Sequence, residues 1–240
     1  MKLFHLALVF AFAGCLFAQP TDILVYHDIS GAYGNAVITA IGNLWPSCNV
    51  VNCSGGTSGY ATFNAAMTSQ EWDIIIAEMW YYNTDDMAWG TLNDISDTTV
   101  LFVSSWEWEN GTSGQMNLAN SLGVTATSPI YSPVIPHYAW DAGHPICSGI
   151  TDWGWADPGL GILNARMTVS TATPVTGWTS SSQAGQAGIC VAPNGQSIIS
   201  GFTPAYANDA VNIWENLLEF MAGGGGALQQ TTWGAIKAGF

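Results

Sequence analysis

Polar and titratable residues follow three apolar runs of this sequence, and their types are those that bind ligands or move protons. His27 and Asp28 follow the first run, Glu78 ends the second, and Ser104 and Ser105 end the third. A histidine beside a carboxylate can act as a general base, and a serine on a strand-to-helix turn can be a nucleophile if its hydroxyl meets that base. With their aromatic and acidic neighbours, these positions give a candidate ligand-binding set of His27, Glu78, Trp80, Ser105, Trp106 and Glu107.

The turn after the third run lacks the features of an activated nucleophile. A G-x-S-x-G elbow needs glycines where the backbone bends sharply, but Val103 and Trp106 stand near those places, and no cysteine falls on this turn. His144 is better explained as fixing a loop by hydrogen bonding, and the roles of His27 and His137 stay open. No catalytic residue is therefore assigned, and the candidates are His27, Asp28, Glu78, Ser105 and His144.

The acidic residues supply hard oxygen ligands of the kind that calcium prefers, but their spacing matches no calcium-binding loop. The cysteines and histidines lack the close pairs of a zinc site. Solvated surface carboxylates explain this pattern better, so we expect no metal and no cofactor. The residues considered are Asp85, Asp86, Glu107, Glu109, Asp141 and Asp157.

Aromatic residues gather in the segments expected to be loops, and the chain has 12 tryptophans. Flat rings with apolar faces and polar edges suit the recognition of sugars. A domain with few charged residues can also use tryptophan simply to pack its loops. Both interpretations stay open for Trp80, Tyr81, Tyr82, Trp89, Trp106, Trp108, Tyr138, Trp140, Trp153 and Trp155.

The elements that must position these residues alternate between strands and helices. Apolar runs predict strands over 22–28, 48–53, 72–80 and 98–106, and helical patterns follow over 35–44, 60–67, 84–95 and 113–122. Continuous apolar runs that alternate with helices indicate a mainly parallel sheet buried on both faces. Because the carboxyl ends of parallel strands share one edge, the candidate residues are expected to converge there.

The second half of the chain departs from this alternation. Residues 125–157 predict a long irregular insertion, and short strands follow over 166–169, 174–178, 187–192 and 197–201. A last helix over 209–222 carries an apolar stripe of the kind that packs in a core. The stripe consists of Val211, Trp214, Leu217, Leu218 and Met221.

The two ends of the chain differ in composition from the domain between them. Lys2, an apolar run and small residues before Gln19 are typical of a signal peptide over 1–18, although lipidation of Cys15 is an alternative. The α/β domain is then 19–222, followed by a glycine linker over 223–226 and a tail over 227–240. We therefore expect a secreted, periplasmic or cell-surface protein without a transmembrane span.

The charge balance excludes some partners. Removing the leader would leave Arg166 and Lys237 against 17 carboxylates, so the formal charge becomes 2 minus 17, or −15. Nucleic acid would be repelled, whereas a neutral glycan or a cell-surface component remains a candidate partner. The oligomeric state is left open.

Four cysteines remain after cleavage and could pair in an oxidising compartment, namely Cys48, Cys53, Cys147 and Cys190. A strand between Cys48 and Cys53 would hold them about 17 Å apart, beyond the reach of a disulfide. The pairing is otherwise open.

The order of these segments resembles class I glutamine amidotransferase-like, or ThuA-like, domains of flavodoxin-like fold over residues 21–222. The resemblance lies in His144-Pro145-Ile146, Gly149-Ile150 and Gly201-Phe202. It implies a three-layer α/β sandwich, but the catalytic cysteine of the active enzymes is missing from the turn that reads Val103-Ser104-Ser105-Trp106. The tail TTWGAIKAGF resembles the conserved C-terminal ends of exported proteins of some environmental bacteria.

Three hypotheses follow. The first is an exported, non-catalytic domain that binds a ligand or partner, with a glycan as candidate. The second is a hydrolase or sugar-modifying enzyme that uses a histidine and a carboxylate at the carboxyl edge of the sheet. The third is a surface-assembly component with a sorting tail.

Overall fold

The computed structural model describes residues 19–29, 31–54, 56–78, 86–104, 113–130, 135–155 and 164–223. The expected leader over 1–18 and the tail over 227–240 lie outside these residues. Within the described part, no helix is long and apolar enough to cross a membrane.

The centre of the molecule is a seven-stranded sheet in the order β2-β1-β3-β4-β11-β10-β8. The first five strands of that order run parallel, and β10 is antiparallel to both β11 and β8. The strands are β1 Asp22–His27, β2 Asn49–Asn52, β3 Ile74–Glu78, β4 Val100–Ser104, β8 Thr173–Pro174, β10 Ile189–Val191 and β11 Ile198–Ser200.

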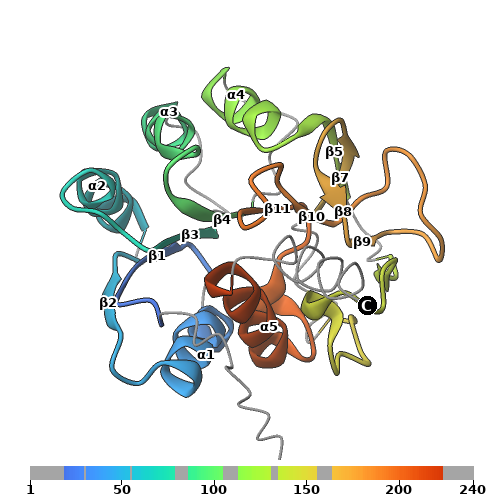
Figure 1. Ribbon diagram of the computed structural model, residues 1–240, viewed down its shortest axis with the longest axis horizontal. Coiled ribbons are helices and arrows are strands. Elements are labelled where there is room, and N and C mark those ends of the chain that lie inside the picture. The colour runs from blue at the N-terminus through green and yellow to red at the C-terminus, as the bar shows by residue number, and fades with distance from the viewer. Residues whose placement is uncertain are drawn as a thin grey trace, which may run out of the picture.

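Helices cover both faces of this sheet, and Figure 1 shows α2, α3 and α4 on one side with α1 and α5 on the other. The α-helices are α1 Ala36–Leu44, α2 Gly56–Met67, α3 Asp86–Ile95, α4 Ser113–Ser121 and α5 Ala210–Ala222. Three short 3-10 helices are η1 Gly31–Asn35, η3 Pro145–Cys147 and η4 Pro204–Tyr206. The predicted flavodoxin-like three-layer sandwich is confirmed.

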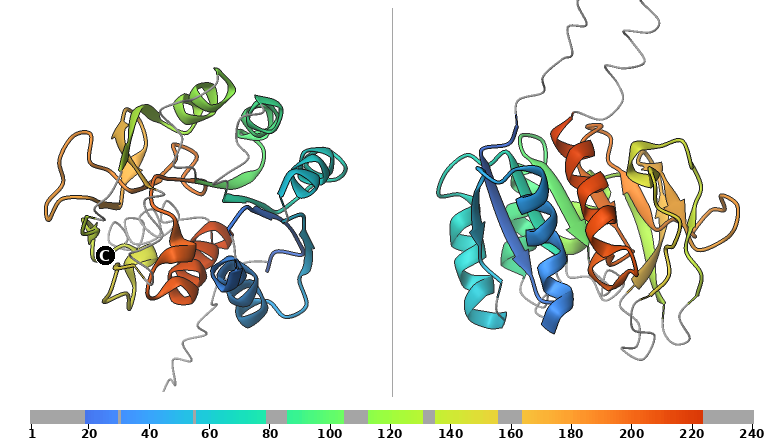
Figure 2. Two further views of the ribbon diagram at one scale, coloured as in Figure 1. Left: turned by 180° about the vertical axis from the view of Figure 1, so that it is seen from behind. Right: turned by 90° about the horizontal axis from the view of Figure 1, so that it is seen from below.

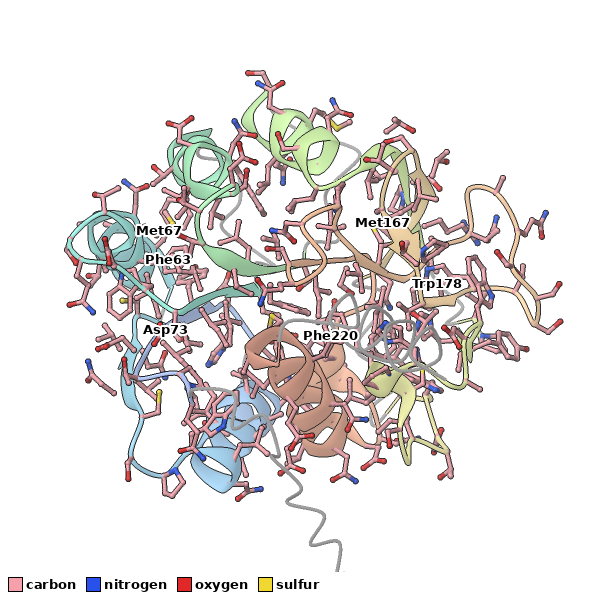
Figure 3. The ribbon with its side chains drawn as sticks, in the orientation of Figure 1. Phe63, Met67, Asp73, Met167, Trp178 and Phe220 are labelled. Carbon is pink, nitrogen blue, oxygen red and sulfur yellow. The ribbon has the colours of Figure 1, made fainter. Side chains whose placement is uncertain are left out.

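The core has two halves because successive residues of a strand point to opposite faces. Val25 and Ile76 pack with α1 and α5, whereas Tyr26 and Ala77 pack with α2 and α3. Figure 3 shows Phe63 and Met67 beside α2 and Phe220 beside α5, on opposite sides of the sheet. Of the predicted stripe on the last helix, Trp214, Leu217, Leu218 and Met221 are buried and Val211 is partly buried.

The segment expected to be irregular begins with a strand that the sequence did not reveal. Strand β5 Val124–Ile130 pairs antiparallel with β7 Asn164–Val169, in a ribbon outside the main sheet. Pro129 obscured this strand, since proline disfavours central strands but is tolerated in an edge ribbon. Short strands β6 Tyr138–Ala139 and β9 Thr176–Gly177 form a second ribbon. Figure 2 shows these segments beside the sheet at the end away from β2.

The four cysteines of the domain are all free thiols. Strand β2 separates Cys48 from Cys53, as predicted, so these two do not pair. Cys53, Cys147 and Cys190 are buried.

Candidate functional site

Four polar residues lie in register across neighbouring strands at the carboxyl edge of the sheet. His27 on β1 pairs with Glu78 on β3, and Glu78 pairs with Ser104 on β4. Ser200 on β11 continues the row as the partner of Ser104. Residues in register on parallel strands share one face, here the face covered by α1 and α5, and neighbouring strands lie about 4.8 Å apart. We call these four residues the edge row.

The edge row lies at the topological switch point of the sheet. From β1 the chain crosses first to β2 on one side and later to β3 on the other. The loops that follow β1 and β3 therefore diverge to opposite faces, as the positions of α1 and α3 show (Figure 1). Ligands of open α/β sheets bind outside the carboxyl ends of strands at such a point. His27 and Glu78 are the last residues of these two strands.

Glu78 is the most unusual residue of the row, because a carboxyl group is rarely buried without a cation. It is only 1% exposed, and its Oε1 accepts a hydrogen bond from the Ala205 backbone N–H at 3.2 Å. Its Oε2 is buried without a partner among the described residues. Burial raises the pKa of Glu78 to about 8, against the opposing effect of the Ala205 N–H. The side chain is therefore mostly protonated at neutral pH.

His27 is half-buried beside Glu78, and its backbone N–H donates to the Ser54 hydroxyl at 2.9 Å. Its ring packs directly against Gly34 of η1, where a Cβ atom would collide with the ring and lie 2.7 Å from the Ile29 carbonyl oxygen. Burial lowers the pKa of His27, and the backbone of Ile29 acts in the opposite direction. The imidazole is therefore mainly neutral at neutral pH.

The 3-10 helix η4 closes over this edge and supplies the N–H that reaches Glu78. Ser200 fixes the chain before η4, because its hydroxyl donates to the Phe202 carbonyl at 2.5 Å and accepts from the Phe202 N–H at 3.0 Å. Gly201 between them has no room for a Cβ, which would collide with the Ala165 backbone. The Asn164 side chain accepts from the Thr203 N–H at 3.0 Å. The position of the Ala205 donor is thus set by β7 and β11.

Aromatic rings surround the same edge. Tyr33 of η1 lies against Tyr206 of η4, with ring centroids 5.2 Å apart, and Trp155 lies 6.4 Å from Tyr206. Ile29 and Ala205 complete this small cluster. The Trp155 indole Nε1 is buried without a partner among the described residues. The edge thus combines polar groups with flat rings.

Several of the predicted site residues cannot be compared with this geometry. Trp80, Ser105, Trp106 and Glu107 all lie outside the described residues. Asp28 is half-buried, and its N–H donates to the Glu78 carbonyl at 3.2 Å. Of the predicted candidates, the structure therefore brings together His27, Asp28 and Glu78.

His144 lies elsewhere in the fold. Its Nδ1 accepts from the Ile146 N–H at 3.3 Å at the start of η3, and its ring packs on Phe220 with centroids 4.9 Å apart. Asn216 of α5 donates to the carbonyls of Ile146 and Ser148 and holds this segment on the helix. His144 is therefore not part of the edge row.

The second buried histidine, His137, belongs to the core. Its ring stacks on Phe202 at 4.3 Å and contacts Trp178 at 4.4 Å. Its Nε2 lies 2.7 Å from the Thr176 hydroxyl, which also accepts from the Ile189 N–H. Burial lowers the pKa of His137 to about 3, so the ring stays neutral over the physiological range.

The thiols of the domain are not activated for nucleophilic chemistry. Burial raises the pKa of Cys147 to about 12 and raises the pKa of Cys48, Cys53 and Cys190 as well. A catalytic cysteine needs the opposite shift. The described residues also contain no group of three potential metal ligands.

A cavity of about 590 Å³ lies at the opposite edge of the sheet and is lined by residues such as Asp22, Glu71 and Asp73. Its carboxylates already have partners, since Asp73 accepts from the backbone N–H groups of Thr21 and Asp22. These bonds hold the start of β1 in place. The cavity is therefore lined by residues with structural roles.

Sequence reasoning missed Ser200, Tyr33 and the Ala205 N–H. The apolar run that ends in Ser200 did indicate a strand, but no local signal showed that this strand pairs with β4. The Ala205 N–H lies 127 residues from Glu78 in sequence, so only the tertiary fold connects them.

The comparisons with known proteins support the fold. No protein-family model and no curated protein matches the chain. Among solved structures, a ThuA-like protein from Bacteroides uniformis superposes with a TM-score of 0.50 and 12% identity, over 85% of this chain and 91% of that one.

Two further structures are similar to this chain. A ThuA-like protein from Parabacteroides merdae gives a TM-score of 0.48 with 10% identity, over 87% of this chain and 92% of that chain. A GMP synthase subunit from Thermoplasma acidophilum gives 0.47 with 8% identity, over 88% and 98%. The chain has a ThuA-like, glutamine amidotransferase-like fold, and identities this low carry no function across.

Proposed function

We propose that this chain is an exported, non-catalytic domain that binds a ligand at the β1/β3 edge, with a glycan as the candidate ligand. The observation that carries the proposal is the edge row, in which an uncharged Glu78 lies buried beside a neutral His27 at the switch point. The raised pKa values of the four thiols favour binding over thiol catalysis.

The aromatic cluster supports a sugar as the ligand. Tyr33 and Trp155 are only partly buried, and each belongs to a segment at this edge. Sugar rings stack on such side chains through their C–H faces, while the hydroxyls seek polar partners of the kind that Glu78 and His27 supply.

The test is a titration with uncharged hexasaccharides of N-acetylglucosamine, β-1,4-linked glucose and mannose. Tryptophan fluorescence reports binding, and a reducing-sugar assay reports turnover. We expect saturable binding without product release, and weaker binding in a Glu78→Leu variant. Absence of binding by all three sugars would contradict the proposal.

A second candidate is an acid–base enzyme, and the pKa directions favour it specifically. Burial raises the pKa of Glu78 and lowers that of His27, which gives one group that can donate a proton and another that can accept one. Release of shorter sugars by the wild type, lost in Glu78→Leu, would establish this function in place of the first.

A further inference from the structure

We propose that the ligand group that reaches the β1/β3 edge is uncharged and accepts a hydrogen bond from the protonated carboxyl group of Glu78. This inference rests on the proposed binding function and names the chemical class that the site selects.

The hydrogen-bond geometry locates the proton. Because the Ala205 N–H already donates to Oε1, that oxygen acts as an acceptor, and the hydroxyl of the protonated group is Oε2. Oε2 is buried and has no partner among the described residues. A buried donor without an acceptor costs about 1–3 kcal/mol. A carbonyl or hydroxyl oxygen of a ligand would supply the missing acceptor.

No cation near Glu78 favours its ionised form. Arg166 is the one Lys or Arg within the described residues, and it lies on β7 opposite Ser128, in the ribbon outside the main sheet. The titratable groups around Glu78 are His27 and Asp28 from β1 and its end, Tyr33 from η1 and Tyr206 from η4. None of these carries a positive charge at neutral pH when His27 is neutral.

The charge of the ligand determines how its binding responds to pH. An uncharged ligand that needs the Oε2 hydroxyl loses affinity as Glu78 ionises, because only the protonated fraction is competent to bind. A cationic ligand gains affinity over the same range, since it favours the carboxylate. An anionic ligand meets a chain of strongly negative charge and binds weakly throughout.

Three hexasaccharides of different charge provide the probes: N-acetylglucosamine, its deacetylated glucosamine counterpart, and galacturonate. For wild type, we expect N-acetylglucosamine hexamer to bind about 30-fold more weakly at about pH 9.5 than at about pH 6, given the pKa of about 8. A tighter complex with the glucosamine hexamer, strengthening as pH rises, would overturn the inference. So would an affinity for the neutral sugar that does not change with pH.

Two variants separate the hydrogen bond from its titration. Glu78→Gln retains a donor but cannot ionise, so its affinity should no longer depend on pH, whereas Glu78→Leu should lose affinity at every pH. Glu71→Gln, an exposed glutamate at the opposite edge of the sheet, is the matched control and should keep the wild-type profile. Retained pH dependence in Glu78→Gln would assign the titration to another group and overturn the inference.

Infrared spectroscopy of the free protein tests Glu78 without a ligand. The C=O stretch of a protonated carboxyl group should be present at neutral pH in wild type and absent in Glu78→Gln. If no hexasaccharide binds, the proposed glycan function fails and this band decides the inference alone. An ionised Glu78 at neutral pH overturns the inference even if a sugar binds.

Discussion

At the residue scale, Glu78 and His137 are the two buried titratable groups that control how stability depends on pH. Their pKa values shift in opposite directions from the same cause, because burial disfavours the charged form of each. A carboxyl group with a raised pKa favours folding at low pH, whereas a histidine with a lowered pKa favours folding at high pH. The domain should therefore be most stable at intermediate pH.

Glu78→Gln should remove the part of this dependence that lies above the pKa of an exposed glutamate. The wild type loses stability as pH rises from the unfolded value of 4.5 towards the folded value of about 8, since unfolding then releases a buried group to ionise. Between about pH 5 and pH 7.5, the variant should gain about 3 kcal/mol relative to wild type. Urea unfolding of both proteins measures this difference, and parallel stability curves would contradict it.

His137→Phe should flatten the acid side of the curve. In wild type, stability is lost as pH falls below 6.5 towards about 3, because the unfolded chain takes up a proton that the buried ring does not. Between about pH 6.5 and pH 4 this loss amounts to about 3 kcal/mol for wild type, and the variant should show little of it. The variant's stability is expected to be lower throughout, since Thr176 loses its partner. A wild-type acid slope in the variant would refute the assignment.

At the element scale, the first half of the sheet follows from sequence and the second half follows only partly. Strands such as β3 and β4 are continuous apolar runs between helices, so their type and direction are predictable. Strand β5 is not, because Ser128 and Pro129 interrupt its β-branched residues and its pairing with β7 is a tertiary matter. His27 and Glu78 were predicted since they end such runs, whereas Ser200 and Ala205 depend on long-range pairing.

The packing of η1 against β1 gives a prediction with a matched control. Gly34→Ala should push the His27 ring or the Ile29 carbonyl from its place, at a cost of about 1–3 kcal/mol, and weaken sugar binding. Gly42→Ala on α1 meets nothing within 4 Å and should stabilise the helix by about 0.5–1 kcal/mol without affecting binding. Thermal unfolding and fluorescence titration compare the two variants. Equal effects would show that the contact with His27 is unimportant.

At the scale of the whole molecule, the two ends of the described domain lie together and away from the edge row. Gln19 and Pro20 line the same small cavity as Met221 and Ala222, beside Asp73 at the amino edge of the sheet. Figure 2 shows the start of β1 and the end of α5 at the same end of the molecule. Segments attached there would leave the β1/β3 edge accessible.

Deletion of residues 231–240 should therefore leave folding and ligand binding intact. If the tail acts in sorting, the deletion should change where the protein accumulates, and cell fractionation with unfolding curves measures both effects. Unchanged localisation would remove the sorting hypothesis, and a destabilised domain would show that the tail contributes to the fold.

Hydrogen exchange with and without the N-acetylglucosamine hexamer tests the central claim most directly, because it locates the ligand on the backbone. The binding account predicts slower exchange at the end of β1, at the end of β3 and in η4, including the Ala205 N–H that bonds to Glu78. Protection confined to the opposite edge around Asp22 and Asp73, or no protection anywhere, would contradict it.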